Sequence, residues 1–174
     1  MSGFKHKLLG VFAVTVLVFS LSGCGYHVGF IKHPQLDSIA VAPAVNESAI
    51  YNVASDMRSM MSEAIMQDGT YKLSDQHRAD AILYLVVKDA SFADVSDASI
   101  DDEDTYKPIE WQTRVTVEYR LVIPGQGEPL LSGQVTGDAR FQAPLDIESS
   151  RLRAVRQACY VAAQNVVYSI TEGW

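Results

Sequence analysis

Histidines, serines and closely spaced glycines are the residues of this chain that could do chemistry, and their spacing does not favour catalysis. Beyond residue 23 the histidines are His27, His33 and His77, and no two of them have the spacing of metal ligands. Gly125 and Gly127 lack the length and the following helix of a phosphate-binding loop. No serine lies in the strand–turn–helix context of a hydrolase nucleophile. We therefore expect no enzyme and no metal or other cofactor.

Acidic residues are concentrated between Asp94 and Asp104. Such carboxylates could bind a divalent cation, but the segment lacks the glycine and the closing glutamate of a calcium-binding loop at the required spacing. A solvated, mobile loop is the favoured interpretation, with a cation site as the alternative.

A different chemistry is indicated at Cys24. Lys5 and Lys7 precede an apolar run at residues 8–19, which is shorter than the ~20 residues that a membrane-spanning helix needs. Residues 21–24 then read Leu-Ser-Gly-Cys, the order of a lipobox, in which the cysteine thiol receives a diacylglyceryl group. We predict that residues 1–23 are a cleaved lipoprotein signal peptide and that acyl chains such as palmitate on Cys24 hold the protein on a membrane. A chance cysteine after an apolar run is the alternative.

The residue after the cysteine and the overall charge limit where the chain works. Gly25 replaces the aspartate that retains lipoproteins of enterobacteria in the inner membrane, which favours the periplasmic side of the outer membrane. Residues 1–23 contain Lys5 and Lys7 but no acid, so the mature chain has 12 basic and 21 acidic residues, a net charge of −9. This charge argues against a nucleic-acid partner and against broad binding to anionic lipid surfaces.

Strand and helix patterns begin after a tether at residues 24–37. A short strand is predicted at residues 38–43, and apolar residues at helical spacing predict a helix over residues 53–67. We assign the methionine-rich face of this helix to the core rather than to a ligand site. Residues 70–73 could add a short strand, and residues 79–90 form an apolar strand.

The second half of the chain predicts a β-hairpin and a helix. Residues 111–123 and 130–141 both alternate apolar and polar side chains, and the proline- and glycine-rich residues between them suit a hairpin connection. Asp146 is expected to cap the last helix. The apolar stripe of that helix is Leu152, Val155, Cys159, Ala162, Ala163, Val166 and Ile170. Cys159 is therefore expected to be a buried, inert thiol, with a reactive or intermolecular thiol as the alternative.

These elements predict an α/β (α+β) two-layer sandwich at residues 38–174, in which two helices pack on one face of a mixed four- to five-stranded sheet. The first strand–helix–strand unit should have parallel strands, and the later hairpin is antiparallel. The opposite face of the sheet is polar and is left open to a partner.

Basic side chains on this polar face are the candidate ligand-binding residues. Arg114, Arg120 and Arg140 point to it, and Lys88 lies on the neighbouring strand. Strand geometry places Arg114 and Arg120 roughly 20 Å apart. Such a row could bind the phosphates of an anionic lipid through charge-assisted hydrogen bonds. The alternative is an ordinary hydrated sheet face with cross-strand ion pairs.

Several short motifs follow one another along the mature chain, and their order is informative. They are Cys24-Gly25-Tyr26-His27, Ser38-Ile39-Ala40-Val41-Ala42-Pro43 followed by Asn46, Asp68-Gly69, Ala79-Asp80-Ala81-Ile82-Leu83, Val115-Thr116-Val117, and a closing helix that runs to Trp174. This order resembles the LPS-assembly lipoprotein (LptE) family, in particular its diverged members outside the proteobacteria.

The resemblance implies a non-catalytic partner of the LptD outer-membrane β-barrel. It implies a plug inside that barrel, which helps the barrel to assemble and passes lipopolysaccharide to the outer leaflet, and a sandwich with two helices on one sheet face. No local motif transfers the family's ligand-binding residues, so the four basic residues rest on strand geometry alone. A lipid-anchored adaptor of another envelope secretion or transport complex is the alternative function.

Overall fold

The computed structural model describes residues 33–95, 110–142 and 146–172. The predictions for the signal peptide, for Cys24, for most of the tether and for acidic residues 96–104 lie outside these ranges. In chain order the elements are β1 (Ser38–Val41), β2 (Val45–Asn46), α2 (Val53–Asp68), β3 (Lys72–Leu73), β4 (Ala81–Asp94), β5 (Glu110–Val122), β6 (Leu131–Gln142) and α3 (Ile147–Glu172).

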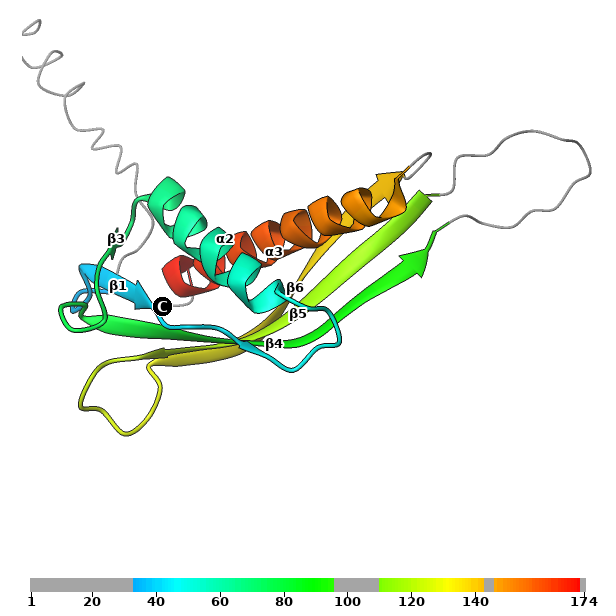
Figure 1. Ribbon diagram of the computed structural model, residues 1–174. Coiled ribbons are helices and arrows are strands. Elements are labelled where there is room, and N and C mark those ends of the chain that lie inside the picture. Colours follow the sequence, from blue (N-terminus) through cyan, green and yellow to red (C-terminus); the bar gives the residue numbers. More distant parts are fainter. Residues whose placement is uncertain (1–32, 96–109, 143–145, 173–174) are drawn as a thin grey trace, which may run out of the picture.

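Both helices lie over the same side of one long sheet (Figure 1), as predicted. The strand order is β3-β1-β4-β5-β6, and β2 continues the line of β1 along the edge of β4. Strand β1 pairs in parallel with β3 and β4, and β2 pairs in parallel with β4, whereas β4, β5 and β6 form an antiparallel meander. The mixed two-layer architecture is therefore confirmed. The sheet has six strands rather than the expected four to five. The strand that was not predicted is the short β2.

Local sequence sets the ends of the helices. Helix α2 ends at Gly69, whose φ of 73° lies in the left-handed region that glycine adopts without a steric penalty. Helix α3 begins after Asp146, whose carboxylate accepts a hydrogen bond from the backbone N–H of Ser149 at 3.2 Å. This hydrogen bonding with Ser149 lowers the pKa of Asp146. The predicted cap of the last helix is confirmed.

The core lies between the helices and the sheet. Alternate residues of β4 and β5, such as Leu83 and Val117, are fully buried in this core. The methionine-rich face of α2 supplies Met57 and Met61, also fully buried, which confirms its assignment to packing. The predicted apolar stripe of the last helix is wrong at one residue, because Leu152 is 65% exposed. Helix α3 extends beyond the N-terminal end of α2 (Figure 1), so its first turns have no neighbouring helix to cover that side.

Helix α3 packs most closely on β6, at Gly137. A Cβ atom at this glycine would lie 2.1 Å from the backbone oxygen of Ala158 and 2.4 Å from the backbone nitrogen of Ala162. Only a residue without a side chain allows the helix backbone to approach the strand this closely. The contact fixes α3 on one face of the hairpin and leaves the other face free.

The first turns of α3 are held to the distal end of the sheet by Arg151. Its guanidinium carbon lies 5.2 Å from the centre of the Phe92 ring and 5.8 Å from that of Trp111, within the range of cation–π interactions. Phe92 in turn packs edge-to-face on Phe141, with ring centres 6.2 Å apart. This cluster joins β4, β5, β6 and α3 where α2 does not reach.

Candidate ligand face on the open side of the sheet

The side of β4, β5 and β6 that faces away from the helices carries the predicted ligand-binding residues. We call it the open face. Arg114, Arg120 and Arg140 are all exposed there, on alternate positions of β5 and β6. Lys88 is also exposed, at the bulge that shifts the register of β4 between Val87 and Asp89. The structure thus places all four basic residues as the strand patterns predict, but three of them are not free.

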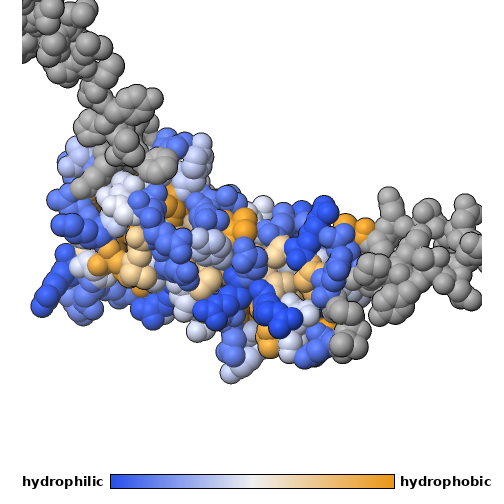
Figure 2. Space-filling model, turned by 90° about the horizontal axis from the view of Figure 1, so that it is seen from above, coloured by the Kyte–Doolittle hydropathy of each residue, from blue (hydrophilic) through white to orange (hydrophobic). Residues whose placement is uncertain are grey.

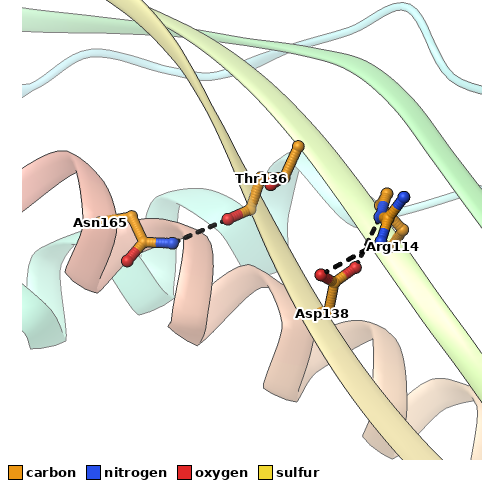
Figure 3. A network of polar contacts seen from close by, with 4 residues as sticks. All are labelled: Arg114, Thr136, Asp138 and Asn165. Carbon is orange, nitrogen blue, oxygen red and sulfur yellow. Dashed lines mark hydrogen bonds and ion pairs between the residues drawn. The ribbon is translucent and has the colours of Figure 1, made fainter.

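Carboxylates neutralise three of the four cations. The Nε atom of Arg114 donates to Asp138 Oδ1 at 2.7 Å across the β5–β6 pair (Figure 3). The guanidinium of Arg140 lies 3.9 Å from the carboxylate of Glu110, and Lys88 pairs with Glu47. These are the cross-strand and edge ion pairs of an ordinary hydrated face, the alternative that the sequence left open.

The ion pairs change what these cations can offer to a ligand. Hydrogen bonds to Asp138 and Glu47 raise the pKa values of Arg114 and Lys88 respectively, so both cations stay charged. Their fields are nevertheless largely cancelled by the partner carboxylates. Water screens exposed ion pairs of this kind and they contribute little to stability, so an anionic ligand could still exchange with the carboxylate at a modest cost.

Arg120 differs from the other three, because no carboxylate pairs with it among the residues that the structure describes. In the register of the sheet its neighbours are Tyr84 on β4 and Ser132 on β6. Both neighbours are exposed, and Tyr84 is 41% exposed. An unneutralised guanidinium is therefore flanked by two hydroxyl groups that can donate or accept hydrogen bonds.

Apolar side chains lie on the β4 side of this cation and at the end of β5, whereas Glu118 lies two residues away on β5. Ile82, Val86 and Val122 are half-buried and lie on the same face as Tyr84, next to Arg120 in the strand register. We call these four side chains together with Arg120 the Arg120 patch. Val45 of β2, which pairs with Val86, extends the apolar surface and is 54% exposed. The patch combines one free cation with an apolar surface.

The sequence did not reveal the Arg120 patch because β4 is apolar at successive positions. Such a strand usually has both faces buried. Here the helices cover only one face, so Ile82, Tyr84 and Val86 remain partly accessible. The prediction of a uniformly polar second face is wrong for β4 and for Val122 at the end of β5, and it is right for the rest of β5 and for β6.

On the helix side of the molecule, seen from above, the surface is mostly hydrophilic with small hydrophobic spots (Figure 2). Two cavities of about 320 and 400 Å³ lie between α2 and α3. Tyr160 donates a hydrogen bond to Gln67 across the same two helices. Among the described residues, no three His, Cys, Asp or Glu side chains gather so that they could hold a metal ion.

Cys159 is fully buried in the core, as predicted. Burial is the main cause that raises the pKa of its thiol to about 12, and the nearby Asp56 carboxylate raises it further. A protonated, inaccessible thiol is a poor nucleophile.

Within the described part of the chain, no helix is long and apolar enough to cross a lipid bilayer.

Comparison with known proteins gives one family and several solved structures. The family described as LptE, lipopolysaccharide-assembly, matches residues 36–170, which is most of the chain. No protein of curated function matches the sequence significantly.

Among solved structures, a candidate lipoprotein from Caulobacter crescentus CB15 is similar with a TM-score of 0.54, 14% sequence identity and coverage of 79% of this chain and 90% of that one. PelC from Paraburkholderia phytofirmans, solved as a dodecamer, has a TM-score of 0.52 at 11% identity and covers 83% and 96% of the two chains. A protein from Chlamydia trachomatis has a TM-score of 0.52 at 9% identity, covering 78% and 93%. At such low identity these likenesses show the shared fold alone.

Proposed function

We propose that this chain is the non-catalytic partner of an LptD-like outer-membrane β-barrel. The proposal starts from its family, because the chain belongs to the LptE lipopolysaccharide-assembly family. In this proposal the lipid on Cys24 anchors it to the periplasmic side of the outer membrane. The folded domain then lies as a plug inside the barrel and helps to assemble it. Family membership accounts for the role in lipopolysaccharide assembly, and the resemblance of the motifs supports the barrel as the partner.

The observation that carries the proposal is the open face. Both helices pack on the other side of the sheet, so the long strands β5 and β6 expose one complete face. A domain that buries only one side of its sheet has a broad, rigid surface for docking. The paired charges on this surface suit a hydrated protein interface, in which polar groups mainly give specificity.

The Arg120 patch is the part of the open face best suited to lipopolysaccharide itself. A guanidinium binds phosphate through two parallel hydrogen bonds, and the exposed Tyr84 adds a hydroxyl group beside it. The apolar Ile82, Val86 and Val122 could contact the lipid portion of the same molecule. Lys88, Arg114 and Arg140 would contribute only after exchanging their carboxylate partners for the ligand.

The partner is tested by affinity purification of the full chain through a C-terminal tag from detergent-solubilised outer membranes. A photoreactive amino acid at exposed Gln134 on the open face should form a covalent adduct with the LptD-like barrel. Depletion of the protein should leave that barrel poorly assembled and reduce lipopolysaccharide at the cell surface. Recovery of a secretion or transport complex without the barrel would instead favour an adaptor function, and normal surface lipopolysaccharide after depletion would contradict the proposal.

Ligand binding is tested by Arg120→Glu. Removing a charge-assisted hydrogen bond of about 1.5–3 kcal/mol should weaken the binding of purified lipopolysaccharide roughly 10- to 100-fold. The melting temperature should not change, because Arg120 is exposed. The measurement is lipopolysaccharide binding to the full chain in detergent, alongside a thermal melt.

Arg114→Gln is the matched control, since this arginine lies on the same face and strand but is already neutralised by Asp138. It should change lipopolysaccharide binding by less than about threefold. Equal losses in the two variants, or unchanged binding by Arg120→Glu with a retained melting temperature, would remove the Arg120 patch from the ligand site.

A further inference from the structure

A cleft of about 400 Å³ lies between α2 and α3, on the side of the sheet away from the open face. We call it the helix cleft. Its lining residues are Arg153, Arg156, Gln157 and Tyr160 on α3, and Met60 and Glu63 on α2. Because all of them lie on two packed helices, the fold holds these side chains in place. The volume of the helix cleft is in the range of cavities that bind small molecules.

The two walls of the helix cleft carry opposite charges. Arg153 and Arg156 are exposed on the α3 wall, and Glu63 is exposed on the α2 wall. In the ranges that the structure describes, neither arginine forms an ion pair with a carboxylate. Arg153 donates to the Ser150 hydroxyl at 3.1 Å, and Glu63 accepts a hydrogen bond from Gln67 at 3.1 Å. The opposite charges therefore line a gap that they do not bridge.

This arrangement suits a ligand with an anionic end and a hydroxyl-bearing end. A guanidinium binds phosphate through two parallel hydrogen bonds, whereas the Glu63 carboxylate only accepts hydrogen bonds and repels an anion. Between them, Gln157 can donate and accept, and the Tyr160 hydroxyl, which donates to Gln67, can still accept. An acidic peptide would place carboxylates beside Glu63, while a sugar phosphate presents hydroxyl donors there.

We infer that the helix cleft binds a phosphorylated sugar, with the phosphate on Arg153 and Arg156 and the sugar hydroxyls on Glu63 and Gln157. A free sugar phosphate and the headgroup of a lipid present the same groups to these residues. The helix cleft and the Arg120 patch lie on opposite sides of the sheet, so this inference does not depend on the ligand surface in the proposed function.

Calorimetric titration of the full chain in detergent tests the site with a soluble probe, glucose 1-phosphate. The double variant Arg153→Gln/Arg156→Gln should weaken its binding roughly tenfold or more, because charge-assisted hydrogen bonds to phosphate are lost. Arg58→Gln is the matched control, since Arg58 is exposed on α2 but does not line the helix cleft. It should change the binding by less than about twofold. Melting temperatures should not change, because all three arginines are exposed.

Glu63→Ala separates a sugar phosphate site from a simple anion site. The binding of glucose 1-phosphate should weaken about fivefold or more, because the sugar hydroxyls lose an acceptor. The binding of inorganic phosphate should instead become stronger, because a repelling carboxylate has been removed. An equal gain for both probes would show an anion site without sugar contacts and would overturn the inference.

Purified lipopolysaccharide is the second probe, titrated into chains that also carry Arg120→Glu. A further loss of roughly tenfold on adding Arg153→Gln/Arg156→Gln would identify a lipid-linked sugar phosphate as the ligand. Unchanged lipopolysaccharide binding, with glucose 1-phosphate binding lost, would identify a free one. Arg120→Glu alone should leave glucose 1-phosphate binding within about twofold, which separates failure of the Arg120 patch from failure of the helix cleft.

Two further results would overturn the inference. One is that neither probe loses binding in the Arg153→Gln/Arg156→Gln variant when its melting temperature equals that of the parent. The other is that a hexa-aspartate peptide binds the parent more tightly than glucose 1-phosphate and depends on the same two arginines, which would assign the helix cleft to an acidic protein segment.

Discussion

Replacing Gly137 by alanine is expected to lower the free energy of unfolding by about 3 kcal/mol or more, at the upper end of the range for an overpacked site. The added Cβ would lie 2.1 Å from the oxygen of Ala158 and 2.4 Å from the nitrogen of Ala162. Both are backbone atoms of α3, so no side-chain rotation relieves the clash. The helix would have to move away from β6 and lose part of its packing on the sheet.

Chemical denaturation and thermal melts of the full chain in detergent measure this effect. Gly127→Ala is the matched control, because a Cβ at this glycine meets nothing within 4 Å and should leave the melting temperature within about 2 °C of the parent. A Gly137→Ala protein that melts like the parent would show that α3 does not approach β6 as closely as described.

The second large effect is a loss of stability in alkali that depends on Cys159. Burial raises the pKa of this thiol from 9.0 to about 12 in the folded state. Between these two values the unfolded chain loses the proton and the folded protein keeps it, so stability falls as the pH rises. The contribution is complete below pH 9 and is lost at about 1.4 kcal/mol per pH unit above it. By pH 10.5 the loss should reach about 2 kcal/mol.

Cys159→Ala isolates this contribution, because other groups that titrate in alkali are the same in both proteins. The quantity to compare is the change in unfolding free energy between pH 8 and pH 10.5, measured by denaturation of the parent and of the variant. The parent should lose about 2 kcal/mol more than the variant over this interval. Parallel curves for the two proteins would mean that the thiol titrates near its ordinary pKa and is not enclosed.

The sequence predicted those parts of the fold that depend on local periodicity. Alternation along residues 111–123 placed the long strand β5 to within one residue at each end, and helical spacing placed α2 equally well. The cap at Asp146 and the burial of Cys159 followed from the position of each residue in its own element. The sides of β5 and β6 were also correct, because side chains of a strand alternate whatever packs on them.

Only the tertiary structure decided which cations are free and where the helix lies. The pairs Arg114–Asp138 and Lys88–Glu47 join residues of different elements, and their register depends on the whole sheet. Leu152 has the spacing of a core residue but is exposed, because α2 does not extend along the first turns of α3 and leaves that side of the helix uncovered (Figure 1). No pattern in the sequence singled out Gly137, which is the place where the helix and strand backbones meet. Periodicity determines which way a side chain points within its element, whereas its partners depend on distances that exist only after the elements have packed.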